Sequence, residues 1–158
     1  MLPPRPKVAL IGYVIPAPLF VFQAARKRYW AEKFGLQVVD SVDSPNDQVA
    51  AAQQIAAGLL ARHSDLDGIL GFLDEPAIGA ALAARAAGRR DVKTFGITAG
   101  SLGRTAIRNG RLTASVFVDP IDLGRKMAQA AYAAAEGIKT PRTVLSGRPY
   151  IVTKANVG

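Results

Sequence analysis

Short runs of apolar and β-branched residues alternate along the chain with longer runs in which apolar positions recur at helical spacing. This alternation is typical of βαβ units, and therefore of a mainly parallel sheet with helices on both faces. The predicted strands are residues 7–13, 36–39, 69–72, 92–97 and 113–118, with a last extended piece at 150–152. The predicted helices are residues 19–34, 45–63, 74–88, 101–109 and 121–136. The sequence thus predicts a doubly wound α/β fold.

Side chains that cap helices stand where several of these helices are predicted to begin. Ser44 and Pro45 combine a hydroxyl cap with a proline at the first helical position. Asp74 is placed to cap the alanine-rich helix, and Asp119 precedes the proline that opens the last helix. His63 shares one face with the apolar positions of its helix, which predicts a partly buried histidine near a helix end.

The length of 158 residues is enough for one self-sufficient core and too little for two sizeable domains. We therefore expect a single domain over 1–158, with a disordered segment at 1–6 and an α/β core at 7–118. The proline-rich opening is unsuited to a signal peptide, and no apolar run approaches the roughly 20 residues of a membrane span. Taken as complete, the chain would stay in the cytoplasm.

Composition removes several kinds of site. The chain has no cysteine and one histidine, so we expect no thiolate chemistry, no metal site and no cofactor. Lys and Arg outnumber Asp and Glu by 20 to 12, a net charge of +8 that permits attraction to polyanions. The basic residues lack interleaved aromatics and a recognition-helix motif, which argues against a nucleic-acid partner.

Ligands of open parallel sheets bind beyond the carboxyl ends of the strands, so the residues just after each predicted strand form the candidate site. These segments lack the glycine spacing of a dinucleotide site and the lysine motif of a nucleotide-phosphate site. A phosphoaspartate receiver shares the alternation and would use Asp74 and Thr98. It also needs an acidic pair after strand one and a lysine after strand five, where this chain has Tyr13-Val14 and Val118-Asp119.

Hydrolytic chemistry is disfavoured by the residues that could perform it. His63, the one histidine base, lies on an apolar helix face with no obvious nucleophile, and Asp74 is more typical of a helix cap than of a reactive carboxylate. Asp74 and Glu75 are adjacent at a helix start, where side chains diverge, so they do not make an acid–base pair. We expect no enzymatic activity, with an enzyme left as a third hypothesis because a fold does not exclude a function.

Several segments together resemble one known family. They are residues 53–69, 74–80, 86–92, 106–116, 119–124 and 152–157, and they include Asp74-Glu75-Pro76-Ala77, Ile107-Arg108-Asn109-Gly110 and Asp119-Pro120-Ile121-Asp122. In order and spacing they resemble the type I periplasmic solute-binding proteins, in particular the sugar-binding branch that serves ABC transporters. The resemblance is specific over 49–157 and less specific over 7–47.

The resemblance implies a protein that captures a sugar or related polar solute and hands it to a membrane permease without covalent chemistry. It also implies a periplasmic location. Members of the family have two similar lobes joined by a hinge, and this chain resembles the second lobe. Lac-repressor-like regulators share the fold, so the effector-binding or oligomerisation domain of a transcriptional regulator is the alternative.

The resemblance also points to candidate ligand-binding residues. They are Tyr13, Phe20, Leu73, Asp74, Thr98, Val118 and Asp119. Polar contacts of the family correspond here to Leu73, Thr98 and Val118, and the arginine often found early in the first helix falls near Val21-Phe22. Sugars need donors and acceptors that match their hydroxyls. The mostly apolar replacements predict a less polar ligand, or a lobe that has lost the function.

The family's counterpart of the predicted helix 121–136 crosses the hinge and packs on the first lobe. The apolar stripe of this helix, which includes Leu123 and Met127, would lack that cover here. We expect residues 119–158 to contact the missing lobe or a partner chain, and we expect the stripe to cause homo-oligomerisation.

Overall fold

The computed structural model describes residues 4–15, 18–141 and 147–158, and for 18–24 and 26 it describes the backbone alone. The strands are β1 Lys7–Tyr13, β2 Gln37–Ser44, β3 Gly68–Gly71, β4 Lys93–Thr98, β5 Ala114–Phe117 and β6 Tyr150–Thr153. The helices are α1 Pro18–Lys33, α2 Val49–Arg62, α3 Asp74–Ala86, α4 Ser101–Arg108 and α5 Pro120–Ala135. These elements follow the predicted order along the chain.

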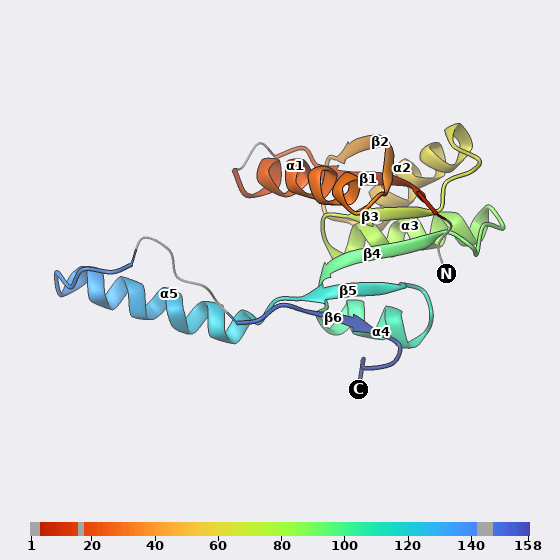
Figure 1. Cartoon of the computed structure of the whole chain (residues 1–158). Coiled ribbons are helices and arrows are strands. Elements are labelled where there is room, and N and C mark those ends of the chain that lie inside the picture. The colour runs from red at the N-terminus through yellow and green to blue at the C-terminus, as the bar shows by residue number, and fades with distance from the viewer. Residues whose placement is uncertain (1–3, 16–17, 142–146) are drawn as a thin grey trace.

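One six-stranded sheet forms the centre of the molecule, in the order β2-β1-β3-β4-β5-β6 (Figure 1). β1 to β5 pair in parallel, and β6 pairs antiparallel with β5 at the edge. The connection from β1 to β2 runs to one side of β1, and the later connections run to the other. Right-handed crossovers therefore place α1 on one face and α2, α3 and α4 on the opposite face. The predicted doubly wound fold is confirmed.

Two apolar clusters hold α2, α3 and α4 to the sheet. One joins β1 and β3 to α2 and α3 and includes Ile11, Leu59 and Ile69. The other joins α3 and α4 to β6 and includes Ile107 and Val152. The last strand is thus part of the packed core as well as of the sheet.

The second helix begins later than the sequence predicts. β2 continues to Ser44, which pairs with Tyr13 of β1, and α2 starts only after the turn that follows. In that turn Ser44 Oγ donates to the carbonyl of Asn46 at 2.7 Å, and Asn46 Oδ1 accepts from the amide of Gln48 at 3.0 Å. The predicted cap at Ser44 is wrong, because sheet pairing uses Ser44 and its hydroxyl closes a turn.

The fifth helix extends away from the sheet (Figure 1), and none of its residues is buried. Leu123 is 42% exposed and Met127 is 65% exposed, so the predicted uncovered apolar stripe is present. No helix within the described ranges combines the length and apolar character that a membrane crossing requires. The predicted disordered segment 1–6 lies partly outside the described residues, and at its end Pro6 is buried.

Candidate functional site at the carboxyl edge of the sheet

The carboxyl ends of β1, β3, β4 and β5, which are neighbours in the sheet, meet at one edge. Tyr13 ends β1 and Leu73 follows β3. Thr98 ends β4 and Val118 follows β5. Phe20 lies in α1, but its side chain is outside the described residues. The structure therefore brings most of the candidate residues to one edge, and their roles in ligand binding stay predictions.

An aromatic pair fixes the β1 side of this edge. The rings of Tyr13 and Phe72 are stacked, with centroids 4.7 Å apart and planes 7° apart. Phe72 is buried and Tyr13 is half-buried. Such a pair contributes about 0.5–1.5 kcal/mol beyond its buried area, so Tyr13 presents a fixed ring at the edge.

Asp74 is buried beneath the edge, with 1% of its surface exposed. Its carboxylate accepts hydrogen bonds from Thr98 Oγ1 at 2.8 Å and from Ser115 Oγ. Ser115 Oγ in turn accepts from the amide of Ala99 at 3.0 Å. The predicted capping role of Asp74 is wrong: α3 starts at Asp74 itself, with Leu73 as the preceding residue and no side-chain cap bond. The carboxylate instead ties α3 to β4 and β5.

Two glycines make the space that this carboxylate occupies. A Cβ atom at Gly96 of β4 or at Gly103 of α4 would come closer to an oxygen of Asp74 than van der Waals contact allows. Together with Ser115 of β5, these positions in β4 and α4 enclose the side chain of Asp74. The sequence did not reveal this arrangement, because the two glycines are distant from Asp74 along the chain.

The turn between β4 and α4 has a strained backbone. Thr98 has φ 115° and Ala99 has φ 45°, in the region that favours glycine, and a β-branched residue there is an outlier. Strain of about 1–3 kcal/mol per residue persists only where neighbouring groups hold it. Here Asp74 accepts from Thr98, and Arg104 Nε donates to the carbonyl of Ala99 at 3.0 Å. Because the Thr98 hydroxyl donates its proton to Asp74, it can only accept from a ligand.

A cluster that the sequence did not single out continues the edge across β5 and β6. Arg104 Cζ lies 5.3 Å from the centroid of the Phe117 ring, and Arg104 Nη2 donates to the Tyr150 hydroxyl at 3.0 Å. The ring centroids of Phe117 and Tyr150 are 5.0 Å apart. In the sheet register Thr98 is opposite Phe117, and Phe117 is opposite Tyr150. The side chains of Thr98, Phe117 and Tyr150 thus share one face of the sheet.

Sequence reasoning missed this cluster for identifiable reasons. Arg104 stands among arginines that resemble a solvated helix face, and Tyr150 follows a stretch rich in glycine and proline. One signal in the sequence could have identified Arg104. It lies one turn into a helix that starts just after a strand, and such a residue lies near the carboxyl edge of the sheet.

Asp119 caps α5, as predicted. Its Oδ1 accepts from the amides of Ile121 at 3.0 Å and Asp122 at 3.1 Å. The adjacent Val118 is 39% exposed. At the β5 end of the edge, therefore, an apolar side chain is presented while the carboxylate is engaged in the helix start.

Lys27 places a cation at the end of β3. Its Nζ donates to the carbonyl of Gly71 at 2.7 Å, and burial lowers the pKa of Lys27 to about 8. In the sequence Lys27 belongs to the basic run Arg26-Lys27-Arg28, which by itself does not distinguish it from an exposed residue. In the structure its side chain turns inward to a strand end.

His63 lies away from this edge, at the end of α2, where Nε2 is 3.0 Å from Asp40 Oδ2. Hydrogen bonds from Arg62 and then His63 hold the pKa of Asp40 below its usual value. The predicted half-buried histidine at a helix end is confirmed. Within the described ranges, no three His, Asp or Glu side chains gather as a metal site requires.

Comparison with known families identifies the class of this protein. The family described as periplasmic binding protein domain matches residues 16–139, more than half of the chain, and the chain belongs to that family. Its fold is the type I fold of periplasmic sugar-binding proteins. The ribose import binding proteins of Salmonella typhimurium and Escherichia coli are both 31% identical to it over 85 residues, which are 54% of this chain and 29% of theirs.

Solved structures of similar fold cover nearly the whole chain. A periplasmic ribose ABC transporter structure from Conexibacter woesei matches 99% of this chain and 53% of its own, with a TM-score of 0.85 and 20% identity. An ABC transporter solute-binding protein from Agrobacterium vitis with bound D-fucose matches 96% and 52%, with a TM-score of 0.82 and 25% identity. The chain spans about half the length of these structures.

Proposed function

We propose that this chain is a solute-binding lobe of a sugar-type ABC transporter binding protein and that it captures a small molecule without covalent chemistry. The observation that supports this most is the single edge shared by Tyr13, Thr98 and Tyr150, at the place where open parallel sheets bind ligands. The family and the names of its relatives point the same way. A lone lobe presents half of a cleft, so tight binding requires a second lobe or partner to complete it.

We propose further that the ligand is less polar than ribose. Leu73 and Val118 offer no hydrogen bond, and the Thr98 hydroxyl can only accept. Within the described part of the chain, the Tyr150 hydroxyl accepts from Arg104 and finds no acceptor for its own proton, which it can therefore donate to a ligand. Aromatic rings at both sides of the edge suit the apolar face of a deoxy sugar.

A ligand panel tests this proposal. D-Ribose, D-allose, D-fucose and myo-inositol are titrated by calorimetry and by thermal unfolding, and the deoxy sugar D-fucose is expected to bind most tightly. Ligand at about 100 times its Kd adds about 2.7 kcal/mol, or about 5–10 °C in Tm for a domain of this size. Preference for D-ribose would contradict the less polar ligand. Because a lone lobe binds weakly, the titrations extend to the solubility limit of each sugar, and no binding by any member there would contradict the solute-binding role.

A matched pair of variants locates the site. Tyr150→Ala is expected to weaken binding at least tenfold, whereas Tyr132→Ala, which removes a 65% exposed ring from α5, leaves affinity unchanged. Equal effects of the two substitutions would place the ligand elsewhere.

We propose that the protein is located in the periplasm and that its partner is an ABC permease, because both belong to a transport function. Release of the protein in its native cell by osmotic shock tests the location, and co-purification with a permease tests the partner. The regulator alternative would instead require retention in the cytoplasm.

We propose that the uncovered stripe of α5 pairs with a second copy of the chain. Leu123 and Met127 are exposed, and α5 buries no residue against its own sheet. Light scattering at micromolar concentration is expected to give a dimer mass that falls to the monomer mass in Leu123→Glu/Met127→Glu. Gln129→Glu adds charge to the same helix as a control and is expected to leave the dimer intact.

A further inference from the structure

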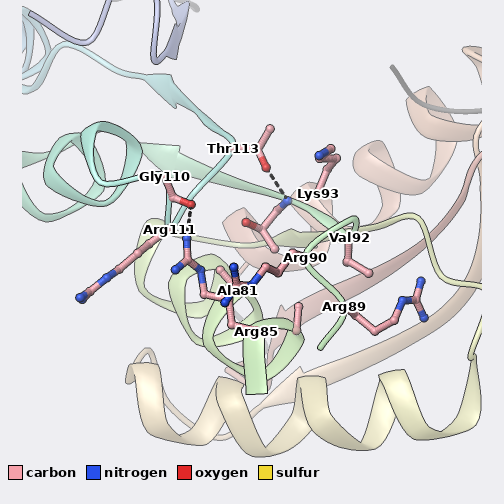
Figure 2. A pocket seen from close by; sticks show the side chains of 11 residues that line it. Ala81, Arg85, Arg89, Arg90, Val92, Lys93, Gly110, Arg111 and Thr113 are labelled. Atoms are coloured by element: carbon pink, nitrogen blue, oxygen red, sulfur yellow. Dashed lines mark hydrogen bonds between the residues drawn. The ribbon is translucent and has the colours of Figure 1, made fainter. Parts of the chain in front are cut away.

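A small cavity opens at the other edge of the sheet, where β4 and β5 begin (Figure 2). It has a volume of about 140 Å³ and lies between the second half of α3, the start of β4 and the turn before β5. The cationic residues that line it are Arg85, Arg89, Arg90, Lys93 and Arg111. None of the described residues along its wall is acidic.

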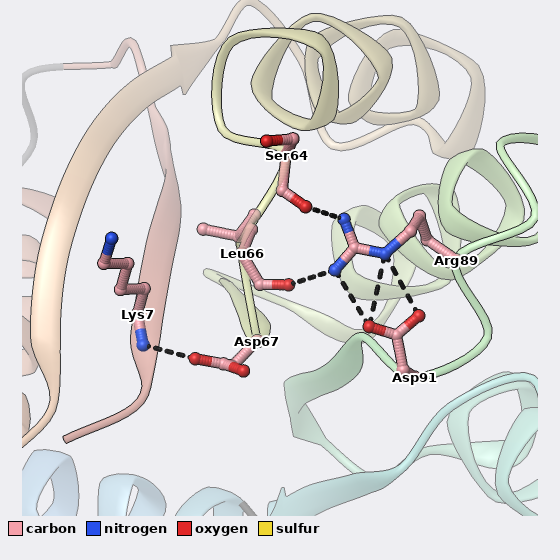
Figure 3. Close-up of polar contacts among 6 residues, drawn as sticks. All are labelled: Lys7, Ser64, Leu66, Asp67, Arg89 and Asp91. Atoms are coloured by element: carbon pink, nitrogen blue, oxygen red, sulfur yellow. Dashed lines mark hydrogen bonds and ion pairs between the residues drawn. The ribbon is translucent and has the colours of Figure 1, made fainter. Parts of the chain in front are cut away.

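Arg89 is already committed to the fold (Figure 3). Its guanidinium donates to the carbonyls of Ser64 and Leu66, the latter at 2.9 Å, and to the carboxylate of Asp91 at 2.8 Å. In Figure 2 its side chain extends away from the other arginines. Arg89 therefore neutralises Asp91 and holds the turn that carries Arg90.

Arg85 and Arg90 differ from Arg89 in the direction of their side chains and in their partners. Both side chains extend toward the space between α3 and the Gly110 turn in Figure 2, whereas Arg111 extends outward. Arg85 Nη2 donates to the carbonyl of Gly110 at 2.7 Å, which uses one of its five guanidinium protons. In the described part of the chain, Arg90 and Arg111 have no carboxylate partner.

Thr94 and Thr113 complete the wall of the cavity. Thr113 Oγ1 accepts from the amide of Thr94 at 3.0 Å, so its own proton can be donated to an anion. The cavity thus presents hydrogen-bond donors from α3, from the turn before β4 and from the turn before β5.

Helix dipoles explain only part of this arrangement. Cations are favourable near helix C-termini, and the contact of Arg85 with the carbonyl of Gly110, just past the end of α4, is of this kind. Arg90 makes no such contact among the described residues. Two guanidinium groups that face one small cavity without an acid repel each other, and a bound anion removes that repulsion.

We propose that this cavity binds a phosphate-class oxyanion between Arg85 and Arg90, with Lys93, Arg111 and Thr113 at its rim. Guanidinium groups suit the geometry of phosphate oxygens and can bind them in bidentate fashion. The volume is below the 300–1,000 Å³ of typical organic-ligand sites, which fits a compact ion or one phosphate of a lipid headgroup. The site lies on the edge opposite the proposed solute site and does not depend on it.

Titration of the full chain with inorganic phosphate at low ionic strength tests the proposal. Calorimetry is expected to give saturable binding of about one phosphate per chain. Affinity is expected to fall at least fivefold in Arg90→Gln, which removes no described bond, and further in Arg85→Gln/Arg90→Gln. Arg28→Gln/Arg125→Gln removes the same charge elsewhere and is expected to change affinity less than twofold. Equal losses in both double variants, or no saturation, would overturn the proposal.

Vesicles separate the two sources of phosphate. If the ligand is a headgroup, vesicles with phosphatidylglycerol sediment the chain and the Arg85→Gln/Arg90→Gln variant is released, while neutral vesicles bind neither. If the ligand is free phosphate, the calorimetric result stands and no vesicle sediments the chain. Equal sedimentation of all variants would show attraction by net charge alone and would overturn the headgroup as the ligand, and the calorimetric comparison then decides the site.

Discussion

Asp74 joins three elements through one buried side chain. Gly103→Ala is expected to lower the free energy of unfolding by about 1–3 kcal/mol, because the new Cβ would overlap the carboxylate. In an Asp74→Ala background the overlap is gone, so Gly103→Ala should cost less, with a coupling energy of about 0.5–3 kcal/mol. Urea unfolding of the four proteins measures this cycle.

The control for this cycle is Gly124→Ala in α5. A Cβ at Gly124 meets nothing within 4 Å, and alanine is the better helix former, so this variant should be neutral or more stable by up to about 1 kcal/mol. Additive costs of Gly103→Ala and Asp74→Ala would show that the two sites are independent.

Individual aspartates show where residue-level prediction succeeds. Asp119 caps its helix because the next residue is a proline and the carboxylate has only local amides to bind. Asp74 also stands at the start of a helix, two residues before a proline, yet its carboxylate binds hydroxyls from β4 and β5. Those partners are fixed by the sheet, and no local pattern reports them.

The β4–α4 turn is the element where strain and hydrogen bonding meet. Thr98→Val keeps the shape and removes the donor to Asp74, and it should lower the free energy of unfolding by about 1–3 kcal/mol. Thr98→Ser keeps the donor and removes the branched methyl, so it should change stability by less than about 1 kcal/mol or increase it. Thermal unfolding of the pair measures this, and equal losses would mean that the hydroxyl is unimportant.

The start of α5 is held to the returning chain by Asp122. Bonds from the Gly147 amide, then from Lys126 and Arg125, lower the pKa of Asp122 to about 2. An unfolded aspartate titrates near 3.9, so this carboxylate stabilises the contact above about pH 4 and the stabilisation is lost as pH falls toward 2. The protection factor of the Gly147 amide, which compares its exchange rate with the intrinsic rate at the same pH, should fall over that window. Asp122→Asn should give low protection at every pH.

At the scale of elements, periodicity located every strand and helix, and errors were at their ends. β2 runs on to Ser44 because β1 offers a partner up to Tyr13, which is a fact about pairing and not about local propensity. Capping residues mark where a helix can begin, but such a residue can instead pair with a neighbouring strand, as Ser44 does with Tyr13.

For the whole molecule, the order of elements predicted a candidate site at the carboxyl edge, since parallel strands must end together. The contribution of Tyr150 in β6 to this edge was hidden, because its partners Phe117 and Arg104 are distant along the chain. The same limit applies to the cationic cavity, whose arginines come from separate turns. We retain the division into a core at 7–118 and a contacting segment at 119–158 as a proposal, with β6 joined to the core sheet.

The route of the chain between β5 and β6 allows a decisive test of that division. Phe117 and Tyr150 are directly opposite each other in an antiparallel pair, so an Asn-Gly turn can replace residues 118–149 and close a hairpin. The shortened protein should keep its fold with a Tm within a few degrees, because α5 buries no residue. It should also be monomeric by light scattering.

Truncation after Phe117 provides the contrast. It removes β6 together with the buried side chains of Val152 and Val157, and the loss should amount to several kcal/mol because each buried valine contributes about 1.5–3 kcal/mol. If the hairpin protein unfolded as readily as the truncated one, α5 would be part of the core. A stable hairpin protein that still dimerised would instead place the contact between copies outside α5.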